Sequence, residues 1–308
     1  MINFLVNGRG LQHSEEWKPY CWVNVEEPNE QDKKFLFEKL NIPVEFFNDI
    51  EDMDERPRIE IEDGWKLILI RIPYKSTDTD NPFETLPLGM IFKEDVFVTV
   101  CFRKTDLIKD FVGFTQRKNI TKEDNINFVL RFLLSSSVWF LKYLKQINKR
   151  IKEAEFALEK SVRNEELQTL FKIEKSLVYF TTSLRSNDIL GHRIKNLKIY
   201  HGKLDEELVE DVDIELRQAL ETTKIYSDIL TGMMDAYASV ISNNLNVIMK
   251  RLTSISIILM IPTLIASLYG MNVPNALQGN PMGFWIILVI SFMITAIGTF
   301  VFIKGKMF

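Results

Sequence analysis

The feature that most limits the fold of this chain is a long stretch without charge. From Leu252 to Ile303 there is no Asp, Glu, Lys, Arg or His, although Asp, Glu, Lys and Arg make up 26% of the whole chain. The stretch contains two apolar runs, Leu252–Tyr269 and Gly283–Ile303, of 18 and 21 residues. As helices they would extend about 27 and 32 Å, enough to cross a bilayer. A buried helical hairpin of a soluble domain is disfavoured, because charge is missing from every helix face.

The charges that flank the two runs predict their orientation. Lys250 and Arg251 precede the first run, Lys304 and Lys306 follow the second, and the connecting segment has no positive residue. Positive residues favour the cytoplasmic side, so we expect a multi-pass protein of the cell's inner or plasma membrane with both termini in the cytoplasm. The opening MINFLVNGRG is too short an apolar stretch for a signal peptide, and insertion is expected through the carboxy-terminal helices.

The remainder of the chain divides by its periodicity. Residues 1–120 mix strand and helix signals and predict an α/β domain. Strands are expected at Trp22–Val25, Arg58–Glu62, Lys66–Ile72 and Val96–Phe102, and helices at Gln31–Leu40 and Pro43–Asp54. The remaining predicted segments are a helical region over 121–204, the extramembrane part of a stalk and pore helix over 205–251, a first span over 252–272, an outer loop over 273–282, a second span over 283–303 and a basic tail over 304–308.

A very long helix is predicted before the first span. Thr121 is the expected N-cap of the helical region, with breaks near Asn164 and over Gly191–Gly202. From Asp205 to Tyr269 no proline occurs before Pro262, so one helix of about 100 Å is expected. A solitary helix of that length is not stable without lateral partners, which favours association with further copies of the chain.

One face of that helix carries small, polar or thioether side chains throughout. Strides of four and three lead along Asp235, Ser239, Ser242, Asn246, Met249, Thr253, Ser256, Met260, Thr263, Ser267 and Gly270. The average period of 3.5 keeps one face turned toward a bundle axis. Such a stripe suits either a pore or a dry packed seam. A pore is favoured because the stripe begins at a carboxylate and ends at Gly270-Met271-Asn272, and a seam needs neither.

The side chains of the stripe suit a hydrated divalent cation. Mg²⁺ gives up its water reluctantly, so rings of amide and hydroxyl oxygens that hydrogen-bond its hydration shell fit it well. Asn246 and Asn272 could supply such rings in an assembly. Met249, Leu252 and Met260 would form apolar constrictions, although ordinary helix packing explains any one methionine equally well.

Enzymatic motifs are missing from the sequence. It contains no Walker loop, no nucleophile elbow and no HExxH motif. Cys21 and Cys101 lie in strand-like apolar runs and are expected to be reduced core residues. The sequence therefore predicts a protein that is not an enzyme, and no nucleic-acid partner is expected.

Three segments together resemble the CorA family of metal ion transporters. Tyr269-Gly270-Met271-Asn272 resembles the family's signature at the end of the first span, and the preceding NVIMKRLTSISIILMIPTLIAS is similar to its pore helix. Upstream, WVNVEEP and NDIEDMDERPRIEIEDGWKLILI are similar to its amino-terminal α/β segment. The resemblance covers nearly the whole chain.

The resemblance implies a funnel-shaped homopentamer with five pore helices around the axis. The selectivity filter would be Gly270, Met271 and Asn272, and the pore-lining residues would be Asp235, Asn246, Met249, Leu252, Met260 and Thr263. Mg²⁺ would be both transported and regulatory: cytoplasmic Mg²⁺ held between adjacent subunits by Asp49 and Asp211 would favour the closed state. From the residues alone, each of these two carboxylates reads as a solvated surface group.

Some alternatives stay open at this point. The outer segment VPNALQGNPM has no acidic residue, which should weaken the attraction of cations to the mouth. Mg²⁺, with Co²⁺ and Ni²⁺, is the expected cargo, but a branch of the same superfamily that transports Zn²⁺ shares the Gly-Met-Asn signature. A membrane-anchored scaffold with a dry seam is the alternative of another class.

Overall fold

The structure is a computed structural model, and it describes residues 1–76, 81–160, 164–196, 204–271, 274, 277 and 279–305. The chain forms two compact units, Met1–Gly232 and Met233–Phe308. The helix α6, Glu206–Tyr269, contributes its first part to one unit and its remainder to the other.

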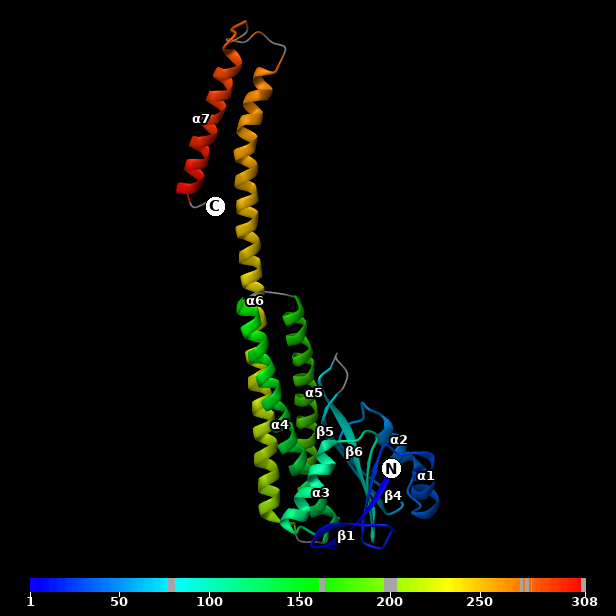
Figure 1. The fold of residues 1–308 in the computed structure, drawn as a ribbon. Coiled ribbons are helices and arrows are strands. Elements are labelled where there is room, and N and C mark those ends of the chain that lie inside the picture. The colour runs from blue at the N-terminus through cyan, green and yellow to red at the C-terminus, as the bar shows by residue number, and fades with distance from the viewer. Residues whose placement is uncertain are drawn as a thin grey trace. The chain divides into compact units, whose positions relative to one another are not determined.

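A mixed sheet organises the amino-terminal unit (Figure 1). In the described part of the chain its strands are β1 (Ile2–Gly8), β2 (Gly10–Ser14), β3 (Trp22–Glu26), β4 (Arg58–Glu62), β5 (Trp65–Lys75), β6 (Phe83–Lys93) and β7 (Val96–Cys101), in the order β2-β1-β3-β7-β6-β5-β4. The β3–β7 pair is parallel and the other pairs are antiparallel. The central strands are buried along almost their whole length, as expected for a sheet covered on both faces.

One face of the sheet is covered by short helices. They are α1 (Glu30–Lys34), its π-helical continuation over Phe35–Lys39 and α2 (Val44–Glu51). Leu36, Phe46 and Ile50 are fully buried here against Leu69 and Val98 of the sheet. Gly89 lets α2 approach closely, since a β-carbon there would lie 2.1 Å from the Ile50 side chain.

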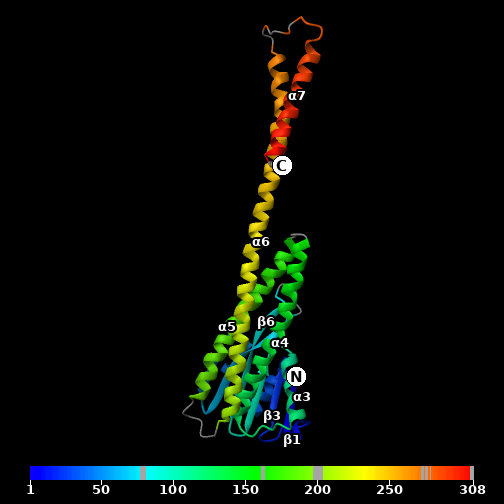
Figure 2. The same cartoon turned by 90° about the vertical axis from the view of Figure 1, so that its left-hand side faces the viewer.

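Long helices cover the opposite face, as Figure 2 shows with α4 and α5 in front of the strands. They are α3 (Asp106–Lys118), α4 (Asn125–Lys160) and α5 (Asn164–Lys195). The Trp22 ring meets Phe111, Phe128 and Phe132 edge-on at centroid distances of 5.4 to 5.8 Å. Its indole N–H donates to Thr99 Oγ1 at 2.8 Å, so the buried polar atom is satisfied.

The first part of α6 packs onto this helical layer. Leu208, Val212, Leu216 and Ala219 are buried at one-turn or two-turn spacings. Asp213 forms an ion pair with Lys195 of α5. These contacts attach the stalk segment to the amino-terminal unit along one face of α6.

The second unit consists of the remaining part of α6 and of α7 (Gly283–Lys304). Both helices contain a window long and apolar enough to cross a membrane. They approach closely at Gly298, where a β-carbon would lie 3.2 Å from Ile261 Cδ1. An apolar cavity of about 650 Å³ lies between them, lined by Pro262, Tyr269 and Phe292 among others.

The described structure confirms the single helix predicted from Asp205 to Tyr269 and corrects several boundaries. α4 begins at Asn125 rather than after Thr121, because Asp124 is the residue whose carboxylate accepts from the Ile126 N–H, at 3.2 Å. α2 ends at Glu51, not Asp54, and Pro43 is its N-cap. The break predicted near Gly191–Gly202 was placed to start too early in the chain, since α5 continues through Gly191 and ends at Lys195.

Candidate functional site

The polar stripe of α6 does not face the other span. Between residues 252 and 271 the better covered positions of α6 are Ser254, Ile258, Ile261 and Ile265, together with Pro262. The described stripe residues are all exposed in the single chain, including Asp235, Asn246, Met249, Leu252, Met260, Thr263 and Gly270. Within this unit the stripe is therefore available for contact with further copies or with water.

Three hydroxyl groups of the stripe donate their protons back to carbonyl groups of the helix. Ser239 Oγ donates to the Asp235 carbonyl at 3.0 Å, Ser256 Oγ to Leu252 at 2.9 Å and Thr263 Oγ1 to Leu259 at 2.9 Å. Because the hydroxyl proton is used in this bond, each hydroxyl oxygen can act toward the outside of the helix only as a hydrogen-bond acceptor. Acceptors are what the water molecules around a cation require, because those waters present their hydrogen atoms outward.

The predicted filter lies where α6 ends. The Gly270 N–H donates to the Ala266 carbonyl at 2.9 Å and so closes the last turn. A β-carbon at Gly270 would lie 3.1 Å from that same carbonyl oxygen, a close contact at the end of the helix. Met271 follows with an exposed side chain, and Asn272 lies outside the described residues.

Asp49 is held by a neighbouring guanidinium. It lies in the last turn of α2, and its Oδ2 accepts from Arg58 Nη2 at 2.6 Å. The same guanidinium contacts Glu60 Oε2 through Nε at 3.0 Å and forms a third ion pair with Glu55. The Asp49 and Arg58 side chains are each about 30% exposed, so this is a partly buried cluster at the protein surface.

Asp211 is exposed on α6 and lines a groove of about 420 Å³ with residues of α3 and α4. Three of the charged neighbours in this groove have partners: Trp139 Nε1 donates to Asp110 Oδ2 at 3.2 Å, and Arg131 lies 3.9 Å from Asp205. α3 and α4 cover one face of the sheet and α2 covers the other (Figure 1). The structure therefore does not bring Asp49 and Asp211 of one chain together.

Metal clusters within one chain are not found in the described ranges: no three His, Cys, Asp or Glu side chains there are placed to hold a metal ion. Cys21 and Cys101 are buried and free, which confirms their predicted core role. Burial raises the pKa of the Cys101 thiol to about 12, so it stays protonated and poorly nucleophilic at neutral pH.

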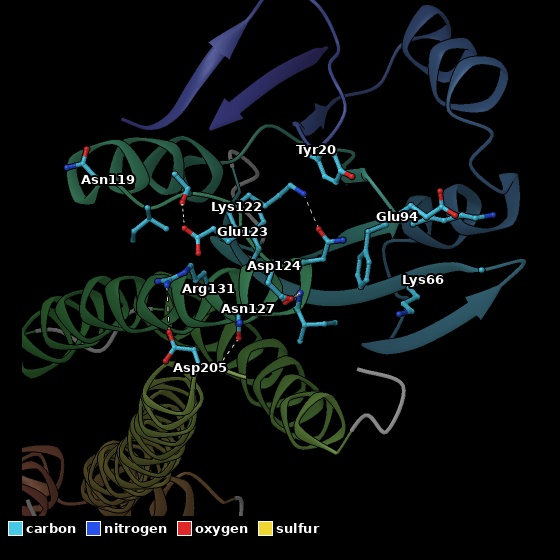
Figure 3. Close-up of a pocket in the computed structure, with 18 residues that line it drawn as sticks. Tyr20, Lys66, Glu94, Asn119, Lys122, Glu123, Asp124, Asn127, Arg131 and Asp205 are labelled. Atoms are coloured by element: carbon cyan, nitrogen blue, oxygen red, sulfur yellow. Dashed lines mark hydrogen bonds and ion pairs between the residues drawn. The ribbon is translucent and has the colours of Figure 1, made fainter. Parts of the chain in front are cut away.

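A further cavity, of about 910 Å³, opens at the start of α4 (Figure 3). Its lining includes both acidic and basic side chains, several of which have an ion-pair or hydrogen-bond partner. Arg131 faces Asp205, Asn127 Oδ1 accepts from the Asp205 backbone N–H at 3.1 Å, and Lys122 donates to Asn125 at 3.0 Å. These contacts tie the beginning of α6 to α4, and they give the cavity a structural role.

The contact between Arg58 and Asp49 was not predicted from the sequence. The two residues lie nine positions apart across the end of α2 and the start of β4, where neither helical nor strand periodicity predicts contact. The only sequence signal is a basic residue that follows a run of acidic residues over 49–55. Only the fold shows which of those acids the guanidinium contacts.

Comparisons with known proteins place the chain among transporters. The family described as CorA-like Mg²⁺ transporter protein matches residues 17–304. The cobalt/magnesium transport protein CorA of Methanocaldococcus jannaschii is 28% identical over 286 residues, which cover 91% of this chain and 89% of that protein. That of Thermotoga maritima is 23% identical over 256 residues, covering 82% and 72%.

A solved structure shows the same fold over the whole length. The complete structure of the CorA magnesium transporter from Methanocaldococcus jannaschii matches with a TM-score of 0.84 and 25% sequence identity. The match covers 98% of this chain and 97% of that one. The α/β domain, long helix and carboxy-terminal spans predicted from the sequence are thus confirmed.

Proposed function

This chain belongs to the CorA-like Mg²⁺ transporter family, and from that premise we propose that it conducts hydrated Mg²⁺ through a pore formed by five copies of α6. As a family member it is a divalent-cation transporter of the membrane and not an enzyme. The observation that carries the proposal is the orientation of the stripe. Its polar side chains are exposed and turned away from α7, so assembly around an axis would line a pore with them.

In this proposal the outer ring is formed by Gly270, Met271 and Asn272. An amide side chain and backbone carbonyls are neutral acceptors, which can bind the waters of a hydrated ion without stripping them. Outward lone pairs of Ser256 and Thr263 continue this acceptor surface below the ring. The absence of a full negative charge there favours passage over trapping, since conduction requires binding weak enough for release.

Apolar constrictions and an acidic mouth complete the path. Met249, Leu252 and Met260 are each more than half exposed in the single chain and would meet at the axis. Such rings can interrupt the water column and so gate conduction by dewetting. Asn246 would add a polar ring near them, and Asp235 would concentrate cations at the cytoplasmic mouth.

The membrane potential would drive entry. The positive residues Lys250, Arg251 and Lys304 support a cytoplasmic amino-terminal unit, so inward flux would follow an interior-negative potential. Moving a doubly charged ion through 100 mV is worth about 4.6 kcal/mol, which is about a 2,000-fold concentration ratio. Neither ATP hydrolysis nor a proton gradient is needed in this scheme.

Regulation by cytoplasmic Mg²⁺ would use Asp49 of one subunit and Asp211 of the next. The structure supports a site between subunits, because the two carboxylates of one chain lie beyond opposite faces of the sheet. Their chemistry fits a hard cation that is held by one or two carboxylates and retained waters. Bound Mg²⁺ would supply a bridge that favours the closed state by differential binding.

The test is flux into liposomes. The purified protein is reconstituted, a negative internal potential is imposed, and Mg²⁺ or Zn²⁺ entry is followed with internal dyes, with and without a pH gradient. Potential-dependent Mg²⁺ entry that is abolished by Asn272→Ala supports the proposal. Asn280→Ala is the matched control, since it removes an amide from the same outer loop beside α7 and should conduct normally.

Two other results would replace the proposal. Zn²⁺ entry that follows the pH gradient would assign the chain to zinc transport. Flux of neither metal from a correctly assembled oligomer would favour a membrane-anchored scaffold, in which the stripe is a dry seam.

A further inference from the structure

The Asp49 carboxylate lies in an unusually acidic segment. Five of the seven residues over 49–55 are Asp or Glu. The positive side chain of Arg58 returns to this segment from the start of β4 and binds Asp49 at 2.6 Å. One oxygen of the Asp49 carboxylate, a proposed Mg²⁺ ligand, is thus already bound to the positively charged Arg58 guanidinium.

The guanidinium is held from three sides. Nη2 contacts Asp49, Nε contacts Glu60 at 3.0 Å, and Nη1 contacts Glu55. Partial burial by itself lowers the pKa of Arg58, but the hydrogen bond with Glu60 and the charges of the three carboxylates outweigh it and raise that pKa. Any arginine guanidinium is protonated at physiological pH, so Arg58 is a fixed positive charge beside Asp49.

A divalent cation at Asp49 would meet this charge directly. Mg²⁺ binds carboxylate oxygens at about 2.0–2.1 Å, or through a retained water a little farther away. In either case the ion and the guanidinium would share one carboxylate in a partly buried site, where screening of their repulsion is incomplete. Full engagement of Asp49 by Mg²⁺ requires Arg58 to withdraw toward Glu55 and Glu60.

We propose that Arg58 is a built-in competitor for Asp49 and sets the Mg²⁺ concentration at which the regulatory site fills. This inference rests on the regulatory site proposed above. In the metal-free state Arg58 occupies Asp49 and stabilises that state, so the apparent affinity for Mg²⁺ falls. Arg58 thereby acts as a positioning and affinity-setting residue without itself binding the metal.

If Arg58 competes for Asp49, removing Arg58 should strengthen Mg²⁺ binding, whereas structural damage should weaken it. Replacing Arg58 by Met frees Asp49, so the regulatory site should fill at lower Mg²⁺ concentration. For a partly exposed ion pair we expect about a fivefold decrease in the half-saturating Mg²⁺ concentration. A variant that merely loosened the α2–β4 segment would weaken Mg²⁺ binding instead.

The experiment titrates the full-length protein in detergent with Mg²⁺ and follows the midpoint of thermal unfolding, alongside Mg²⁺ inhibition of flux in liposomes. Arg58→Met is compared with Arg58→Lys, which keeps the charge. Arg56→Met is the matched control: it removes the same charge from an exposed side chain two residues away. Asp49→Asn and Asp211→Asn report whether the titration monitors the regulatory site.

The expected result is a lower half-saturating Mg²⁺ concentration for Arg58→Met in both measurements, with Arg58→Lys close to the unchanged protein. Arg56→Met should shift it by less than about twofold, since exposed charges are screened. The Arg58→Met effect should disappear in the Asp49→Asn background.

The inference would be overturned if Arg56→Met and Arg58→Met shifted the half-saturating Mg²⁺ concentration equally. It would also be overturned if Arg58→Met raised that concentration. Either result would contradict the role of Arg58 without contradicting the regulatory site. If Mg²⁺ stabilises the unchanged protein and both aspartate variants equally, the regulatory site itself is wrong and the inference falls with it.

Discussion

Two arginines of the amino-terminal unit show how surroundings decide what a guanidinium does. Arg58 binds three carboxylates at the surface, where we propose that a cation competes with it. Arg71 of β5 is buried and is held by neutral oxygens: its side chain donates to the Met53, Glu55 and Thr85 carbonyls and to Thr85 Oγ1 at distances of 2.5 to 3.2 Å. A buried charge with this many acceptors is a structural anchor.

The Arg71 backbone continues the same network. Asn187 of α5 accepts from the Arg71 N–H at 2.9 Å and donates to its carbonyl at 2.7 Å. Ser136 of α4 donates to that carbonyl as well, at 3.2 Å. One residue thus joins the segment after α2, the sheet and the long helices that carry the stalk.

Arg71→Met is therefore expected to destabilise the protein strongly. The substitution removes the Arg71 donor from the buried Thr85 carbonyl and from the partly buried Met53 and Glu55 carbonyls, at a cost of about 3 kcal/mol. The midpoint of thermal unfolding of the full-length protein in detergent measures the loss. Arg117→Met, at an exposed ion pair of 3.8 Å, should change stability by no more than about 0.5 kcal/mol. Similar midpoints for the two variants would contradict the anchoring role.

Residue-scale features could be predicted only where they depend on local sequence. The burial of Cys21 and Cys101 followed from their apolar strands. The partners of Arg71 could not be predicted, because Asn187 lies 116 positions away and the pairing exists only once the sheet and α5 are packed together. The same limit applies to Asp49 and Arg58, whose contact depends on how the chain turns after α2.

Among the helices and strands, the long helices were predicted well from the sequence, whereas several strands were not predicted. The absence of proline between Asp205 and Pro262 predicted the extent of α6, and the uncharged runs predicted both spans. β1, β2 and β6 were not predicted. β6 is buried almost throughout and pairs with β5 and β7, so its apolar run lacks the alternation that marks a half-exposed strand.

The contact between the two spans leads to a prediction about Gly298. A β-carbon there lies 3.2 Å from the flexible end of Ile261, so Gly298→Ala should be accommodated by a small shift. Gly298→Leu should force α7 away from α6 and cost about 1–3 kcal/mol. Thermal unfolding and gel filtration of the detergent-solubilised protein measure the effect on stability and on oligomeric state.

The control adds the same bulk elsewhere on α7. Ala296 is exposed on α7, and Ala296→Leu should leave both properties unchanged. If Gly298→Leu behaves like this control, the two helices do not depend on their close approach at Gly298.

In the whole molecule, the arrangement of the two spans connects the fold with the proposed transport function. One chain supplies one polar face, exposed on α6, and one apolar helix, α7, that leaves this face uncovered. A single polar face cannot enclose water in a bilayer, whereas several copies around an axis can. In the proposed oligomer the same multiplicity would bring Asp49 of one subunit toward Asp211 of the next, so conduction and its regulation would both depend on assembly.

Water access to the stripe is the property that distinguishes a pore from a dry seam. Thr263→Cys places a thiol on the proposed pore face, and Leu264→Cys places one on the adjacent apolar face. The native Cys21 and Cys101 are buried and should react slowly, which keeps the background low. A small positively charged thiol reagent is applied to liposomes during Mg²⁺ entry, and modification and flux are recorded together.

We predict that Thr263→Cys is modified and that its Mg²⁺ entry is then blocked, while Leu264→Cys is unmodified and conducts as before. If neither thiol reacts in a correctly assembled oligomer, or if Leu264→Cys reacts and Thr263→Cys does not, the stripe does not line a water-filled pore and the account is contradicted.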